Sequence, residues 1–138
     1  MPIKYAIDED LRLVYAVAVG RVTLSDLMDH LKTLLQDPAY RRPMKKLVDY
    51  RAGHVIDMSV EETKRLTEFK LRHDETFRGE QCAFVVSDDV DFGLSRVHEM
   101  YVDPLVTTMV FRDVSDAFAW LDVDADSVEV LANRVRES

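Results

Sequence analysis

The sequence is short of cysteine, glycine and proline, and each shortage excludes a class of protein. Cys82 is the only cysteine in 138 residues, so no disulfide can form within the chain and a reducing compartment is expected. The 4 glycines stand apart, at Gly20, Gly53, Gly79 and Gly93, which leaves no glycine-rich loop to hold a nucleotide phosphate. With only 4 prolines, the chain also lacks the composition of a disordered segment.

Basic residues and long apolar runs are scarce too. The chain has 18 Lys and Arg residues against 26 Asp and Glu residues, and its net charge of -8 would repel the phosphates of a nucleic acid. The opening MPIKYAIDEDL lacks the apolar core of a signal peptide, and no run reaches the roughly 20 apolar residues of a membrane helix. We therefore expect a cytoplasmic protein with no membrane span and no nucleic-acid partner.

The composition that remains is typical of one compact domain. The hydrophobic fraction is 47% and the charged fraction is 32%, and a chain of 138 residues can bury a substantial core. We expect a single domain over residues 1–122, followed by a C-terminal helical appendage over residues 123–138.

The spacing of apolar residues changes between a period of two and a helical period along the chain. Alternation at residues 3–7 and 11–19 predicts an antiparallel hairpin. Further strands are predicted at 45–49, 82–86 and 107–111, and helices at 24–36, 59–77, 90–101, 115–121 and around 128–135. The order ββαβαβαβα predicts an α/β domain with a mixed, mostly parallel sheet, an N-terminal β-hairpin and packed helices.

Three short sequence motifs, together with this order of elements, point to a known family. They are LVDYR at 47–51, DMS at 57–59, and VFRD at 110–113 followed by AFAWL at 117–121. Together they resemble the STAS fold of the bacterial anti-sigma factor antagonists and, more closely, the SpoIIAA-like group of small bacterial proteins, over roughly residues 3 to 121. The resemblance implies a non-enzymatic interaction or regulatory module with a protein partner, and it allows a homodimer.

The phosphorylation motif of the antagonists is altered in this chain. In that family, an Asp, two hydroxyl residues and a Gly open the second helix, and a partner kinase phosphorylates the first hydroxyl. The matching residues here are Asp57, Met58, Ser59 and Val60, so Met58 occupies the phosphoacceptor position. Ser59 remains as a phosphorylation candidate, although Ser59 with Glu62 also forms a capping-box pattern, and we favour that structural role.

Polar residues follow the predicted third, fourth and fifth strands, where open α/β sheets bind ligands. They include Asp49, Arg51, Ser87 and Arg112. Two arginines among acids could orient a small polar ligand, whereas the plainer interpretation, which we favour, is that Asp49 and Arg51 cap loops and pair with each other or with Arg112. The alternative function is therefore a small-molecule or lipid-binding domain using these strand ends, since Sec14-type lipid-binding domains have a similar layout.

No spacing in the sequence indicates catalysis or metal binding. The 4 histidines lack a His-x-x-x-His pattern, no Gly-x-Ser-x-Gly elbow is present, and Cys82 falls in a predicted buried strand. We expect no enzymatic activity, no cofactor and no metal. The two candidate functions make different structural predictions: a partner-binding module should expose apolar residues on the second helix, and a ligand-binding domain should have a concave pocket near Asp49, Arg51 and Arg112.

Overall fold

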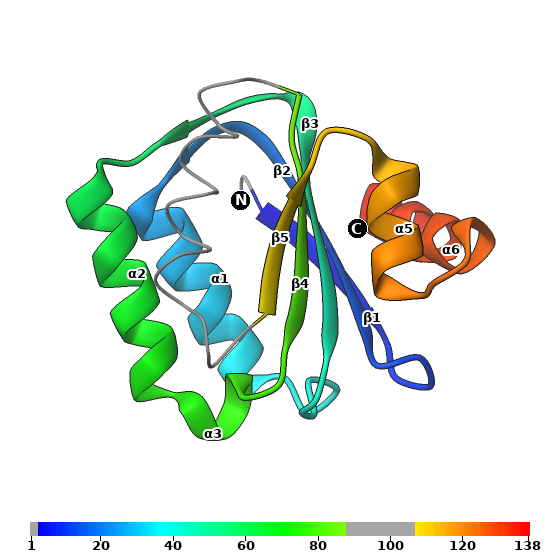
Figure 1. The fold of residues 1–138 in the computed structure, drawn as a ribbon, viewed down its shortest axis with the longest axis horizontal. Helices are drawn as coiled ribbons and strands as arrows, with labels where there is room; N and C mark the ends of the chain where they lie inside the picture. The colour runs from blue at the N-terminus through cyan, green and yellow to red at the C-terminus, as the bar shows by residue number, and fades with distance from the viewer. Residues whose placement is uncertain (1–2, 88–106) are drawn as a thin grey trace.

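The computed structural model describes residues 3–87 and 107–138, with the backbone alone described for residues 52–57, and shows one sheet covered by helices on both faces (Figure 1). Its strands are β1 (Ile3–Asp8), β2 (Leu13–Thr23), β3 (Lys45–Asp57), β4 (Gln81–Val85) and β5 (Thr107–Phe111). They lie in the order β1-β2-β3-β4-β5. The pairing of β1 with β2 is antiparallel and the other pairings are parallel, which confirms the predicted hairpin and mostly parallel sheet.

The helices form two layers. They are α1 (Leu24–Gln36), α2 (Val60–Arg72), the short α3 (Asp74–Phe77), α5 (Val114–Leu121) and α6 (Ala125–Glu137). Figure 1 shows α1 and α2 on one face of the sheet and α5 and α6 on the other. The helix predicted at 90–101 lies outside the described residues. The helix predicted at 59–77 is divided at His73, because the His73 N–H donates to the Lys70 carbonyl and closes the last turn of α2.

β3 is longer than the sequence predicts, and this is the main correction to the fold. Arg51 and Gly53 suggest a loop after Asp49, but the strand continues to Asp57 because β2 is long enough to pair with it. The pairing is irregular between Val17 and Arg21 of β2. Gly20 lies within this stretch with φ at 75°, a conformation that glycine adopts without strain.

Alternating side chains along the central strands supply two separate cores. Val14 and Val48 point to the α1 and α2 side, where they pack with residues such as Leu31 and Phe69. Their neighbours Leu13 and Leu47 point to the other side and pack against α5 and α6. The run Cys82–Val86 is buried throughout, as expected for a strand covered on both faces.

The predicted C-terminal segment, residues 123–138, contains α6. Its buried residues are Val128, Leu131, Ala132 and Val135, whose helical spacing places them on one side. This side packs against β1 and β2 and belongs to the same core as α5. The segment therefore covers part of the N-terminal hairpin.

Candidate functional site

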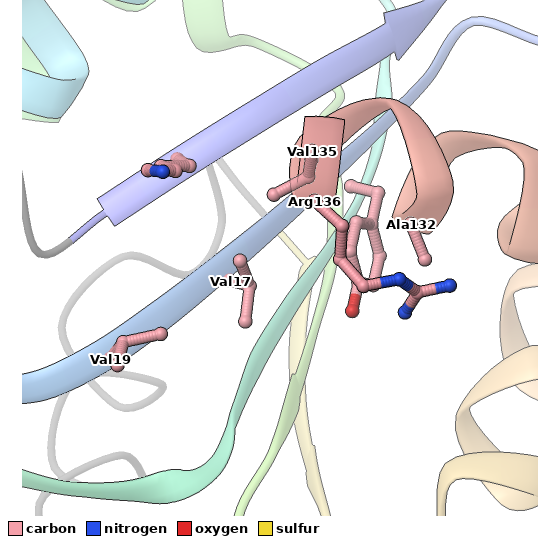
Figure 2. A pocket seen from close by; sticks show the side chains of 7 residues that line it. Val17, Val19, Ala132, Val135 and Arg136 are labelled. Atoms are coloured by element: carbon pink, nitrogen blue, oxygen red, sulfur yellow. The ribbon is translucent and has the colours of Figure 1, made fainter. Parts of the chain in front are cut away.

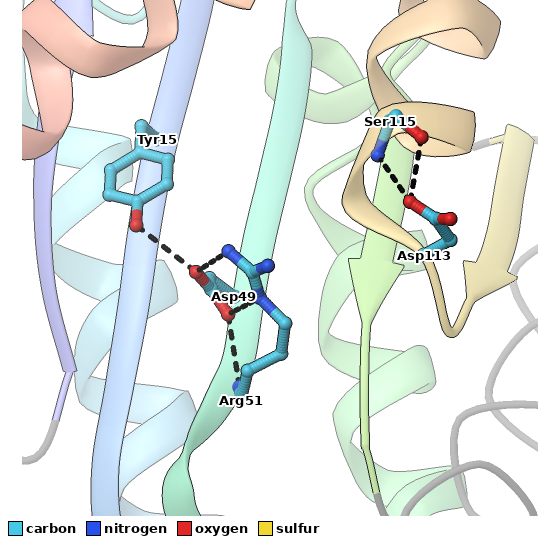
Figure 3. Close-up of polar contacts among 5 residues, drawn as sticks. All are labelled: Tyr15, Asp49, Arg51, Asp113 and Ser115. Carbon is cyan, nitrogen blue, oxygen red and sulfur yellow. Dashed lines mark hydrogen bonds and ion pairs between the residues drawn. The ribbon is translucent and has the colours of Figure 1, made fainter.

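The predicted residues Asp49 and Arg51 form a defined polar cluster with Tyr15 (Figure 3). The Arg51 side chain donates two hydrogen bonds to the Asp49 carboxylate, from Nε to Oδ1 and from Nη2 to Oδ2, each 2.9 Å long. The backbone N–H of Arg51 donates to Oδ1, also at 2.9 Å. From the neighbouring strand, the Tyr15 hydroxyl donates to Asp49 Oδ2 at 3.2 Å. The pairing of Asp49 with Arg51 that the sequence suggests is present.

The cluster lies inside β3, whereas the sequence placed Asp49 at the end of the strand and Arg51 after it. Asp49 pairs with Val85 of β4, which in turn pairs with Phe111 of β5, so β4 and β5 end level with Asp49. Arg51 comes two residues later, near Asp113. The pKa of Arg51 is raised mainly by its hydrogen bond to Asp49, and the charge of Asp113 adds a smaller effect in the same direction. The cluster is therefore at the level where the two short strands end.

Two other predicted residues lie at these strand ends. Ser87 follows β4 and Arg112 follows β5, and both side chains are exposed. The acidic residue beside Arg112, Asp113, accepts hydrogen bonds from the backbone and the hydroxyl of Ser115 and so caps α5 (Figure 3). The sequence places Asp113 beside Arg112 at the end of the fifth strand but suggests Ser115 as the helix cap, whereas in the structure Asp113 is the N-cap.

The electrostatics of the cluster show that its charges are engaged with one another. Burial alone would raise the pKa of Asp49, but hydrogen bonds from Arg51 and Tyr15 outweigh it and hold the pKa below its usual value. Burial and the nearby Asp49 carboxylate raise the pKa of Tyr15 to about 12, so its hydroxyl stays a donor at neutral pH. Arg51 keeps 42% of its side chain exposed, whereas Asp49 keeps only 8%. The arrangement fixes the direction of Arg51 and neutralises its charge.

Ser59 lies elsewhere, at the start of α2. From Asp49 to the last residue of β3, Asp57, the strand runs for roughly 26 Å. Ser59 Oγ accepts a hydrogen bond from the Glu62 N–H at 3.1 Å, and Glu62 Oε1 accepts one from the Ser59 N–H at 3.2 Å. The predicted capping box is confirmed. Met58 is partly buried and packs against the core on the α1 and α2 side.

A concave surface lies beside the cluster, on the α6 side of the hairpin (Figure 2). This groove has a volume of about 490 Å³ and is lined by Lys4, Tyr15, Val17, Val19, Ala132, Val135 and Arg136. Lys4 of β1 pairs with Val17 of β2, so both side chains point to the same face. Tyr15 contributes its ring to the groove and its hydroxyl to Asp49, and therefore links the two.

The opposite face of the sheet holds buried charges that sequence reasoning missed. Lys46, Lys70 and Glu80 are between 1% and 3% exposed. Lys70 Nζ lies 3.5 Å from Glu80 Oε1, and the Tyr40 hydroxyl donates to Glu80 Oε2. Lys46 Nζ lies 2.8 Å from Nε2 of the buried His30. These five side chains form a buried charge network that joins α1, α2, β3 and the residue before β4.

Burial dominates the titration of the buried charge network. It lowers the pKa of Lys46 to about 8 and, with the charges of Lys46 and Lys70, lowers the pKa of His30 well below its usual value. His30 is therefore neutral at physiological pH and accepts the hydrogen bond from the Lys46 ammonium. One signal was available in the sequence. Lys46 is two residues before Val48 in the predicted strand, so the two side chains point to the same buried face.

The described part of the chain offers little for other chemistry. Within residues 3–87 and 107–138, no three His, Cys, Asp or Glu side chains gather as metal ligands would. In the same ranges, no helix is long and apolar enough to cross a membrane. Cys82 is fully buried, and burial raises the pKa of its thiol to about 12, which keeps it protonated at neutral pH.

Comparison with known proteins identifies the fold. The structure is similar to the crystal structure of an uncharacterized protein of the DUF3478 family, with a SpoIIAA-like fold, from Shewanella loihica PV-4. The TM-score is 0.56 and the sequence identity is 18%, and the similarity covers 86% of this chain and 93% of that chain. No model of a protein family and no curated protein matches the sequence. The chain therefore has the SpoIIAA-like, STAS-like fold that the sequence predicts.

Proposed function

We propose that the protein is a non-enzymatic regulatory module that binds a protein partner through the exposed side of α2. The observation that carries this proposal is the presence of two large apolar side chains on that helix, Val60 with 49% and Leu71 with 46% of its surface exposed. They are three helical turns apart, about 16 Å along the axis, and so lie on the same side. Apolar side chains with this spacing can anchor a partner surface.

The surroundings of these two residues suit an interface. Glu61, Arg65 and Glu68 are exposed on the outward side of α2, so charges of both signs flank the apolar pair. The two apolar side chains lie near opposite ends of α2 with charged residues between them, and transient protein interfaces mix apolar and polar side chains in this way. The inward side of α2 is fixed by Leu66 and Phe69 in the core, which gives a partner a rigid surface.

A regulatory role without catalysis also agrees with how the reactive side chains are used. The Ser59 hydroxyl serves as a helix cap, Asp49 is paired with Arg51, and Cys82 is buried and protonated. Because the resemblance matches the phosphoacceptor to Met58, which is partly buried against the core and has no hydroxyl, we propose that partner binding here does not depend on phosphorylation at that site. A phosphate found on Ser59 of protein from its native host would contradict this.

Site-specific photo-crosslinking tests the proposed partner surface. A photoreactive amino acid at position 71 of the full chain should capture a discrete protein in cells, and the Val60→Asp substitution should abolish the capture. The control position is 130, because Val130 on α6 is similarly exposed, at 59%. Equal capture from positions 71 and 130, or capture that Val60→Asp leaves unchanged, would contradict the proposal.

A ligand-binding domain is the second candidate function, favoured by one observation. The groove beside α6 adjoins the Asp49 and Arg51 cluster through Tyr15, and its volume of about 490 Å³ is within the usual range for small-molecule sites. It lies across β2 from the cluster, toward β1. Any ligand would therefore use the α6 side of the hairpin.

A further inference from the structure

We propose that the groove beside α6 binds a small aliphatic carboxylate, with its hydrocarbon part on the valines and its carboxylate paired with Lys4 and Arg136. This inference names the ligand class for the second candidate function, on which it rests. It does not depend on partner binding through α2, which is on the opposite face of the sheet (Figure 1).

The apolar wall of the groove exists because α6 covers only part of β2. Along the side of β2 that faces α6, Leu13 is fully buried, Tyr15 is 8% exposed, and Val19 is 55% exposed. Val17, which lies between Tyr15 and Val19 on this side of the strand, is half-buried. From α6, Ala132 and Val135 complete the wall (Figure 2). A ligand chain laid along this wall would bury the valine surface that the protein leaves in water.

The polar part of the groove carries positive charge in a chain whose net charge is -8. Lys4 and Arg136 are both exposed, and they come from different elements, β1 and α6. Their present contacts are made at the surface: Lys4 Nζ donates to the Ser138 carbonyl oxygen at 3.3 Å, and Arg136 donates to Glu129 at 2.8 Å and to Asn133. Exposed contacts of this kind contribute little, so a ligand carboxylate can replace them.

Two acidic groups of the described residues lie near this position. Asp49 is engaged by Arg51 and Tyr15. Glu129, which gives up its contact with Arg136 to the ligand, has 64% of its side chain exposed, so water screens its charge. The Tyr15 hydroxyl points to Asp49 and stays protonated, so Tyr15 offers the ligand an uncharged ring. Cations beside an apolar wall select a molecule with one anionic end and one apolar end.

Titration calorimetry on the full chain tests this with butanoate, hexanoate and octanoate, and with 1-octanol as the uncharged counterpart of octanoate. We expect affinity to rise about threefold for each added methylene group. We also expect 1-octanol to bind at least about tenfold more weakly than octanoate, because it lacks the charge. Absence of saturable binding, or equal affinity for octanoate and 1-octanol, would overturn the proposal.

Matched variants separate this groove from the rest of the surface. Val19→Asn and Lys4→Gln/Arg136→Gln should each weaken octanoate binding about tenfold or more. The controls Val130→Asn, on the outer side of α6, and Lys32→Gln, on α1, should leave it unchanged. Equal losses in the controls would overturn the proposal. It would also be overturned if Val19→Asn kept its affinity for octanoate and lost self-association, which sedimentation velocity measures. Crosslinking from position 71 should be unaffected by Val19→Asn, so failure of the ligand site and failure of the partner surface give different results.

Discussion

The buried Lys46 gives a quantitative prediction about stability and pH. Its pKa is lowered from 10.5 to about 8 by burial, with the Lys70 charge acting in the same direction and the Glu80 charge opposing it. Because the folded pKa is below the unfolded pKa, the unfolded chain binds more protons between pH 8 and 10.5. The free energy of unfolding therefore rises with pH through that window. The full contribution is about 3 kcal/mol, since one pKa unit corresponds to about 1.4 kcal/mol.

Other groups limit where this effect can be observed. The pKa of Cys82 is raised from 9.0 to about 12 and that of Tyr15 from 10.0 to about 12, and both shifts lower stability at higher pH. The comparison is therefore cleanest between pH 7 and 9, where the Lys46 contribution changes by about 1 kcal/mol. The Lys46→Met variant keeps a side chain of similar length and removes the titrating amine.

Urea unfolding at pH 7, 8 and 9, followed by the fluorescence of Trp120, measures the effect. The free energy of unfolding of the natural chain should increase over this range by about 1 kcal/mol relative to that of Lys46→Met. Lys45→Met is the control, because the Lys45 side chain is only half-buried and reaches toward the Asp122 carbonyl. Parallel pH profiles for the natural chain and Lys46→Met would refute the reasoning, because Lys46 would then not titrate in this window.

Three further predictions concern the other core, a helix cap and the polar cluster. Leu131→Ala removes a fully buried side chain that joins α6 to the hairpin, so it should lower the free energy of unfolding by about 2 to 5 kcal/mol in urea titrations. Ser59→Ala should cost about 1 kcal/mol by the same assay, because the capping box is lost, whereas Ser59→Asp should retain most of the stability. The lowered pKa of Asp49 contributes stability above its unfolded pKa of 3.8, which is lost as the pH falls through the folded pKa. Asp49→Asn should therefore lose less stability than the natural chain between pH 5 and 3, and identical acid profiles would contradict this.

The parts of the fold that the sequence predicted correctly depend on local patterns. Alternation over residues 3–7 and 11–19 specified the hairpin, and helical spacing from residue 24 specified α1, which the structure begins with a complete capping box of Thr23 and Asp26. The same holds for Ser59 and Glu62 at α2. In each case, the residues that determine the structure are close together in the chain, so the pattern is visible without knowledge of the tertiary contacts.

The features that were missed depend on distant residues. β3 continues beyond Asp49 because β2 pairs with it, although Arg51 and Gly53 are typical of a loop. In the buried charge network, the contact between Tyr40 and Glu80 joins residues 40 positions apart. The groove is lined by residues of β1, β2 and α6, which only the packed structure brings together. Sequence spacing alone contains none of this information.

The two proposed surfaces lie on opposite faces of the sheet. Lys70 is on the inward side of α2, and its contact with Glu80 ties that helix to the residue before β4. Breaking one buried charge leaves its partner unpaired, so the contact resists displacement of α2 and keeps the Val60 and Leu71 side in one orientation. The groove lies across the sheet, under α6, where Val19 is left uncovered. A ligand there cannot obstruct a partner on α2, and any effect of one on the other must pass through the central strands as a measurable coupling free energy.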